Sequence, residues 1–174
     1  MKKFCAVLFV VGAIVGLIVA FMGGESVGEN AAYLRVHIRA NSNGAEDQRV
    51  KYLVRDEIVE FLTPTVADCK TKEEAILRIT EKLPQAEKVA ERVLKENGFS
   101  YGARASIRTE EFPTRVYDGV TLEAGIYDAL ILELGTGAGD NWWCVVYPPL
   151  CFTGGNGNIV YKSKIAEIIR SFFS

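Results

Sequence analysis

Residues 33–40 read YLRVHIRA, a run in which apolar and polar side chains alternate. The apolar positions share one face, and they are Leu34, Val36, Ile38 and Ala40. The polar positions share the other face, and they are Tyr33, Arg35, His37 and Arg39. A period of two predicts a strand that is buried on one side and solvated on the other.

Two helices are predicted after this strand. Asn41–Gly44 has the composition of a turn, and apolar residues at helical spacing then predict a helix over 45–62, closed by Pro64. Thr71 followed by Glu74 forms a capping box that starts the next helix. Its pattern is interrupted at Pro84, which predicts a kink or a separate helix over 84–97.

Three further strands are expected over 99–108, 126–134 and 142–147. The glycine-rich segment 135–141 between the last two predicts a flexible hairpin, and a final amphipathic helix is expected over 160–172. Short turns between successive strands favour a largely antiparallel sheet of about four strands, with helices packed on one face. The expected class is therefore α+β.

The N-terminus predicts export. Residues 4–22 carry no charge and follow two lysines, a pattern that fits either a cleaved signal peptide or an uncleaved membrane anchor. Both alternatives leave the basic end in the cytoplasm and put the rest of the chain outside it. We expect a linker over 23–31 and a single extracytoplasmic domain over 32–174, which contacts the membrane through residues 4–22 if these are retained.

Composition argues against several partners. The 174 residues have a net charge of −2 and no basic run beyond the N-terminus, so nucleic acid is not expected. The GTGAG motif at 135–139 lacks both the third glycine of a dinucleotide fingerprint and the Lys-Ser/Thr pair of a P-loop. We therefore expect no nucleotide and no other cofactor.

The chain contains one histidine and no cysteine pair at metal spacing, so no metal site is expected. His37 is the only histidine available as a base, and no G-x-S-x-G elbow accompanies it. An exported hydrolase that uses His37 with Asp47 or Asp56 stays open as an alternative. The arginines near His37 predict either a basic patch or an ordinary solvated face, and they are Arg35, Arg39, Arg104 and Arg108.

Residues 141–152, NWWCVVYPPLCF, crowd aromatic residues beside a Pro-Pro turn. Trp142 and Trp143 are adjacent, so they face opposite sides of a strand, and a one-sided core can take only one of them. An exposed indole beside a rigid turn suits protein binding, whereas helices on both sides would make the segment ordinary core. Cys144 and Cys151 fit either a disulfide or two buried thiols.

Three blocks of the chain resemble stage II sporulation protein R of endospore-forming bacteria. They are LRVHIRANSN with EDQRVKYLVRD at 34–43 and 46–56, FPTRVYDGVTLEAGIYDALILELGTGAGDNWWCVVYPPLCF at 112–152, and the weaker KSKIAEII at 162–169. Glu123 departs from the proline usual in the family.

The resemblance implies a signalling protein that is not an enzyme. Such a protein is made in the forespore, exported into the space between the two membranes, and there activates a membrane-embedded aspartic protease of the mother cell. That protease processes a pro-sigma factor. We expect the partner-binding residues to be Trp142, Trp143, Tyr147, Pro148 and Pro149, with His37, Asn41 and Ser42 as a second patch.

Overall fold

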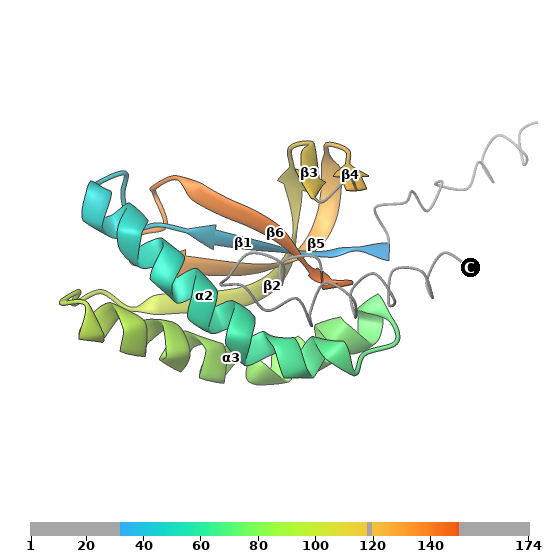
Figure 1. The fold of residues 1–174 in the computed structure, drawn as a ribbon, viewed down its shortest axis with the longest axis horizontal. Helices are drawn as coiled ribbons and strands as arrows, with labels where there is room; N and C mark the ends of the chain where they lie inside the picture. The colour runs from blue at the N-terminus through green and yellow to red at the C-terminus, as the bar shows by residue number, and fades with distance from the viewer. Residues whose placement is uncertain (1–31, 118–119, 150–174) are drawn as a thin grey trace, which may run out of the picture.

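A computed structural model describes residues 32–117 and 120–149 of the chain. Four strands form one sheet in the order β2-β5-β1-β6, and two long helices cover one face of it (Figure 1). The elements, in chain order, are β1 (Leu34–Arg39), α2 (Ala45–Ala67), α3 (Lys72–Glu96), β2 (Ala103–Phe112), β3 (Arg115–Tyr117), β4 (Val120–Leu122), β5 (Gly125–Leu134) and β6 (Asn141–Tyr147). The expected α+β class is confirmed.

The sheet is mixed, so the expectation of a largely antiparallel sheet is wrong. β1 pairs in parallel with β5 and antiparallel with β6, and it lies between them. The connection between β5 and β6 is therefore not a hairpin, as its glycine-rich sequence suggested. It crosses the end of β1. The alternation of polar and apolar residues shows which face of a strand is buried, but it does not show which strands are neighbours, so it could not predict this crossing.

Close backbone packing explains the glycines of this crossing. The N–H of Gly139 donates to the Ala40 carbonyl at 2.8 Å, and the Thr136 hydroxyl donates to the Asn41 carbonyl at 2.7 Å. A Cβ atom on Gly139 would overlap the Ser42 carbonyl. Gly135, at a φ of 58°, would bring a Cβ atom into the Asn41 side chain. The segment is thus a packed crossover, fitted to the chain that leaves β1.

Both prolines expected to end or bend helices lie inside them. α2 continues past Pro64 to Ala67, and α3 is one helix that includes Pro84. The predicted N-terminus of α3 is confirmed, because the Thr71 hydroxyl accepts a hydrogen bond from the N–H of Glu74. The buried face of α3 continues on both sides of Pro84. The free energy gained by packing this face against the core exceeds the cost of the one backbone hydrogen bond that proline cannot make. Its buried residues are Ala75, Ile79, Ala86, Ala90, Val93 and Leu94.

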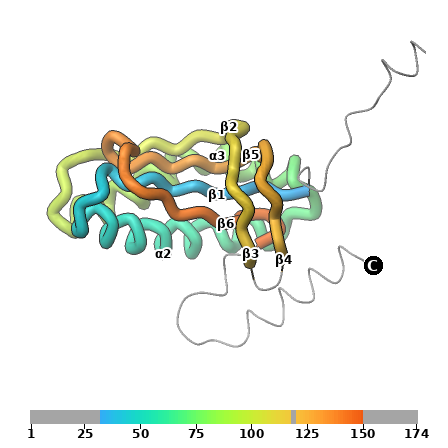
Figure 2. Tube along the Cα trace, turned by 90° about the horizontal axis from the view of Figure 1, so that it is seen from above, coloured from blue at the N-terminus to red at the C-terminus, as the bar shows by residue number. Residues whose placement is uncertain are grey.

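The second face of the sheet is also covered over part of its area. β2 and β5 extend into the short β3–β4 hairpin, which runs across β1 and β6 on the side opposite the helices (Figure 2). A small core lies beneath it, comprising Tyr33, Phe112, Leu122, Tyr127, Ala129, Ile131 and Val145. The polar face of the first strand is therefore not solvated as expected, and Arg35 and His37 are buried.

Several expectations concern parts of the chain that the structure does not describe. They are the signal or anchor over 4–22, the linker over 23–31, the C-terminal helix over 160–172, and Cys151. Among the described helices, neither is long and apolar enough to cross a membrane.

Replacing Gly139 with Ala tests the crossover. Because the added Cβ would overlap the Ser42 carbonyl, β1 and the crossing segment must move apart. We expect the free energy of unfolding in urea to fall by at least about 2 kcal/mol. Gly102→Ala is the matched control, since its Cβ would meet only the end of the Glu91 side chain, which can rotate away. Equal losses in the two variants would contradict a packed crossover.

Candidate interaction surface

The aromatic segment forms β6, an edge strand of the four-stranded sheet. Trp142 is paired with Ile38 and Trp143 with His37, so the two indoles face opposite sides of the sheet. This confirms the predicted alternation. Both tryptophans are half-buried, because each face of the sheet has its own cover.

Trp142 lies on the helix side of the sheet. It packs against the main core, and the guanidinium of Arg55 on α2 lies 5.6 Å from its ring centre. The same guanidinium lies 5.0 Å from the ring of Tyr52, which is exposed. Trp142, Arg55 and Tyr52 thus form a continuous aromatic and cationic ridge between β6 and α2. Trp, Tyr and Arg are the residues most enriched at energetic hot spots of protein interfaces.

Trp143 lies on the opposite face and is held by stacking. Its ring is 3.8 Å from that of His37 at an interplanar angle of 23°, and Phe112 meets it edge-on at 5.0 Å. These contacts fix the orientation of the indole while leaving part of it accessible. A fixed, partly exposed aromatic side chain loses little conformational entropy when a partner binds.

His37 is a structural side chain within this arrangement. Only 1% of it is exposed, and its Nδ1 lies 3.2 Å from Oε2 of Glu110. Burial lowers the pKa of His37, and this effect exceeds the opposing influence of hydrogen bonds to Glu110 and Asn141. The imidazole is therefore neutral at pH 7. Asp47 and Asp56, the carboxylates considered as its partners, bind other groups.

Glu110 also belongs to a closed set of ion pairs on the open part of the second face, which we call the charged ring: Arg39, Arg108, Glu110 and Glu133. Each arginine contacts both carboxylates, at 2.9 to 3.0 Å. Arg108 is the main reason that the pKa of Glu133 is lowered. A basic patch, one of the two alternatives for these arginines, is thus largely neutralised, and Arg104 alone of the four is exposed without a described ion pair.

Asn41 and Ser42 support the crossover beside Trp142 and Trp143. Both donate hydrogen bonds to Asp47, at 2.9 and 2.5 Å, and Tyr101 donates to the same carboxyl group at 2.6 Å. These bonds hold the pKa of Asp47 below its ordinary value, against the opposing effect of burial. The Asn41 side-chain oxygen also accepts from the N–H of Thr136 at 3.0 Å. Ser42 is exposed and Asn41 is half-buried.

Tyr147, Pro148 and Pro149 lie at the other end of β6. All three are buried, and Tyr147 belongs to the core on the helix side. Burial raises the pKa of Tyr147 to about 12. The Tyr147–Pro148 peptide bond is cis. The eight expected binding residues therefore fall into two groups, separated along the strand by roughly 15 Å at the usual rise per residue.

The cysteines are partly described. Cys144 is disulfide-bonded and Cys69 is a buried free thiol. Cys151, the expected partner of Cys144, lies outside the described residues, so their pairing stays a prediction. Among residues 32–117 and 120–149, no group of three potential metal ligands occurs.

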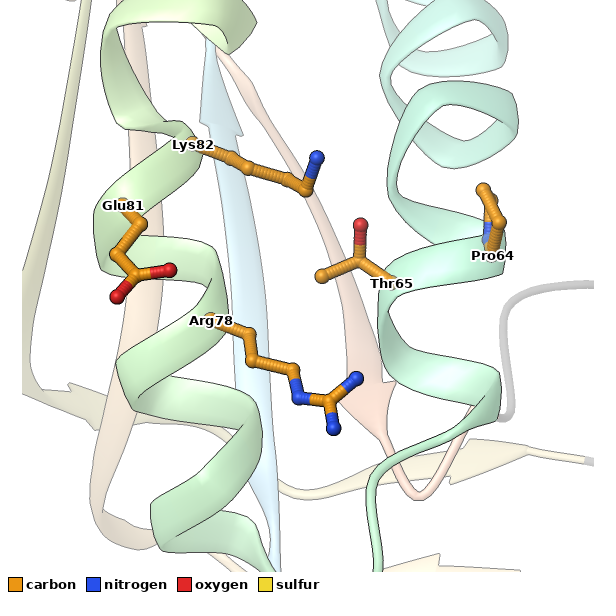
Figure 3. Close-up of a pocket in the computed structure, with 5 residues that line it drawn as sticks. All are labelled: Pro64, Thr65, Arg78, Glu81 and Lys82. Atoms are coloured by element: carbon orange, nitrogen blue, oxygen red, sulfur yellow. The ribbon is translucent and has the colours of Figure 1, made fainter.

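The described pockets offer no obvious catalytic centre. One depression between α2 and α3 is lined by Pro64, Thr65, Arg78, Glu81 and Lys82, whose side chains are shown in Figure 3. Its arginine is paired with Glu74 of the same helix. A second depression is lined by charged residues of α3 alone. Both are open surface features with mixed charge.

Comparison with known proteins identifies the family. Residues 30–156 match the model of a family described as "Stage II sporulation protein R". The chain is 33% identical to stage II sporulation protein R of Bacillus subtilis (strain 168) over 177 residues, which cover 96% of this chain and 79% of the relative. The chain belongs to the stage II sporulation protein R family. This confirms the resemblance and gives the protein a role in sporulation. No solved structure matches.

Two residues of this family member were not singled out from the sequence as site residues. Glu110 joins His37 to the charged ring, and Arg55 covers the Trp142 ring. The alternation of residues 103–112 places Glu110 on the same face as Arg108. In the sheet, however, β5 lies between β2 and β1, and only the way the β2–β5 pair folds over the second face brings Glu110 to His37. No local signal in the sequence marks the contact between Arg55 and Trp142.

The pH dependence of stability tests the buried neutral His37. Its pKa is lowered in the fold, so below pH 6.5 the unfolded chain binds a proton that the folded chain does not. Stability should fall as pH drops below 6.5, by at most about 1.4 kcal/mol per pH unit. Carboxyl groups with a lowered pKa, such as Asp47, Asp128 and Glu133, add a slope of the same sign toward pH 5, so the slope should be shallower in His37→Gln but not zero. The chain has one histidine, so the difference between the two proteins in urea unfolding from pH 5 to 7 measures its contribution. Identical slopes in both proteins would refute it.

Neutralising Glu110 tests the charged ring. In Glu110→Gln, two arginines and His37 lose a shared carboxylate acceptor. Because the group is partly exposed, we expect a loss of about 1–2 kcal/mol in unfolding free energy. The neighbouring Glu111 is exposed and points to the other face, so Glu111→Gln should change stability by less than about 0.5 kcal/mol. A loss that persists unchanged in 1 M salt would argue against an ionic origin.

Proposed function

We propose that this family member acts outside the cytoplasm as an activator of a membrane-embedded aspartic protease, which then processes a pro-sigma factor during sporulation. Membership of the family supports the role in sporulation. The uncharged segment 4–22 supports export. The proposed site of action is the space between forespore and mother cell.

The observation that best supports a binding role is the partial exposure of Trp142 and Trp143 on an edge strand. Trp142 and Trp143 remain half-exposed on an edge strand although each is anchored by a stacked or cationic neighbour. Asn41 and Ser42 lie at the same end of β1, next to the crossover. We assign the docking surface to this end of the sheet, with Trp142 and Trp143 at its centre. The buried Tyr147, Pro148 and Pro149 then support β6 from its other end.

Activation by binding requires a preference for one state of the protease. A ligand shifts a two-state equilibrium only by its difference in affinity for the two states. Driving a protease from about 1% to 99% active needs roughly a 10⁴-fold preference for the active arrangement. A docking surface that recognises two protease subunits together would supply such a preference.

The exported hydrolase is the weaker alternative. It needs His37 beside Asp47 or Asp56, whereas His37 stacks on Trp143 and contacts Glu110. Asp47 accepts hydrogen bonds from Asn41, Ser42 and Tyr101. The described residues therefore do not assemble the pair on which that alternative depends.

Reconstitution tests the proposal. The full chain, the protease and its pro-sigma substrate are combined in lipid vesicles, and the rate of substrate cleavage is measured. Wild-type protein should accelerate cleavage, and Trp143→Ala should raise the concentration needed for half-maximal activation about 30-fold, as for a hot spot of 2 kcal/mol. The control Leu77→Ala removes an exposed apolar side chain from α3 and should change nothing.

Folding of each variant is checked by thermal unfolding, and the assay is run well below the lowest midpoint. Cleavage that is no faster with wild-type protein than without it would refute direct activation. If Trp143→Ala, Trp142→Ala and wild type activate equally, the assigned docking surface is wrong, but direct activation still stands.

A further inference from the structure

Arg35 is the most unusual buried group of the sheet. Its side chain is 0% exposed, and no carboxylate among residues 32–117 and 120–149 forms an ion pair with it. Nη2 donates to the Tyr117 hydroxyl at 2.9 Å, and the guanidinium also interacts with the Tyr127 side chain, while Nε and Nη1 have no hydrogen-bond partner in the same part of the chain. Arginine stays protonated in proteins, so this buried charge cannot be relieved by loss of a proton.

Aromatic rings surround the guanidinium instead of anions. Its central carbon lies 4.3 Å from the ring centre of Phe112, 4.8 Å from that of Tyr127 and 5.8 Å from that of Tyr117. Ring faces attract a cation, but they satisfy N–H donors poorly. Arg39, four residues along the same strand, contacts two carboxylates. Arg35 is thus a positioned, buried cation that has no ionic partner among residues 32–117 and 120–149.

We propose that Arg35 is a binding residue for a carboxylate carried by an acidic segment of a protein partner, which replaces the Tyr117 hydroxyl. Of the three rings around the guanidinium, Phe112 and Tyr127 are buried, whereas Tyr117 is half-buried at the end of the three-residue strand β3. Tyr117 is therefore the cover that this proposal requires to move. A carboxylate then accepts two parallel bonds from the guanidinium edge, a geometry specific to arginine. Exposed Val116 and Arg115 beside Tyr117 provide apolar and cationic contacts for the same segment.

The inference rests on the proposed function only for the identity of the partner. It adds a second contact, under the β3–β4 hairpin, with defined chemistry. The carboxylate is chosen over a phosphate or nucleic acid because one enclosed guanidinium with aromatic walls offers a small planar site and no extended basic surface.

A peptide experiment tests the site without the protease. The probes are acetyl-Leu-Glu-Glu-Leu-amide and its Gln counterpart, added to the full chain in detergent micelles. Tyr117→Ala removes the cover, so it should bind the Glu peptide at least about tenfold more tightly than wild type. Its preference for Glu over Gln should disappear when Arg35→Met is added. Arg104→Met is the control, because it removes the same charge from an exposed position on β2 and should leave the preference intact.

Stability separates a binding role from a structural one. Replacing an uncompensated buried charge by an apolar side chain is often neutral or stabilising, so Arg35→Met should unfold at the wild-type temperature or above while losing the peptide preference. If Arg35→Met does not fold, Arg35→Lys decides, since it keeps the charge without the planar fork and should lose at least about tenfold in affinity. Equal binding of Glu and Gln peptides, or a preference retained without Arg35, overturns the inference.

The same variants enter the reconstituted cleavage assay. Arg35→Met should lower activation, and Arg104→Met should not. A failure of wild-type protein to activate refutes the proposed function but leaves the peptide result to decide the role of Arg35. Full activation by a folded Arg35→Met variant overturns the role of Arg35 in this partnership and leaves the proposed function standing.

Discussion

The fold depends on one constraint: β1 is paired along both edges and covered on both faces over much of its length. Its apolar side chains face the helices, and its polar side chains face β3–β4 and the charged ring. Burying a charged or polar group costs several kcal/mol unless the fold supplies partners for it. Each polar residue of β1 therefore determines what must lie above it.

The partners differ from one end of β1 to the other. Arg39 is balanced by carboxylates, His37 combines a carboxylate with a stacked indole, and Arg35 is enclosed by aromatic rings. The second face thus changes from ionic to aromatic within five residues. Trp143 lies at the transition, and its contact with His37 links the interior of the sheet to the proposed docking surface.

The elements themselves could be predicted from the sequence, because local patterns encode them. Alternation identified β1 and the facing of Trp142 and Trp143, and the Thr71–Glu74 pair identified the start of α3. Pro64 and Pro84 misled because proline lowers helix stability locally, whereas packing of the whole apolar stripe decides helix length.

The topology and the second core could not be predicted in this way. Insertion of β1 between β5 and β6 depends on contacts far apart in the sequence, so the glycine-rich segment was interpreted as a hairpin. Arg35 and His37 are covered because the β2–β5 pair bends over the second face of the sheet and continues into the β3–β4 hairpin. The alternation of polar and apolar residues does not predict such a bend. For the same reason, Glu110 could not be recognised as the partner of His37, and Arg35 was assigned to a surface.

The central claim is that this member of the stage II sporulation protein R family works by contact, through the end of the sheet that carries Trp142 and Trp143. Hydrogen–deuterium exchange of the full chain in vesicles, with and without the protease, measures that contact most directly. We expect slower exchange at the start of β6 and in residues 40–43 when the protease is present, with exchange in α3 unchanged. Unaltered exchange throughout, or protection confined to α3, would contradict it.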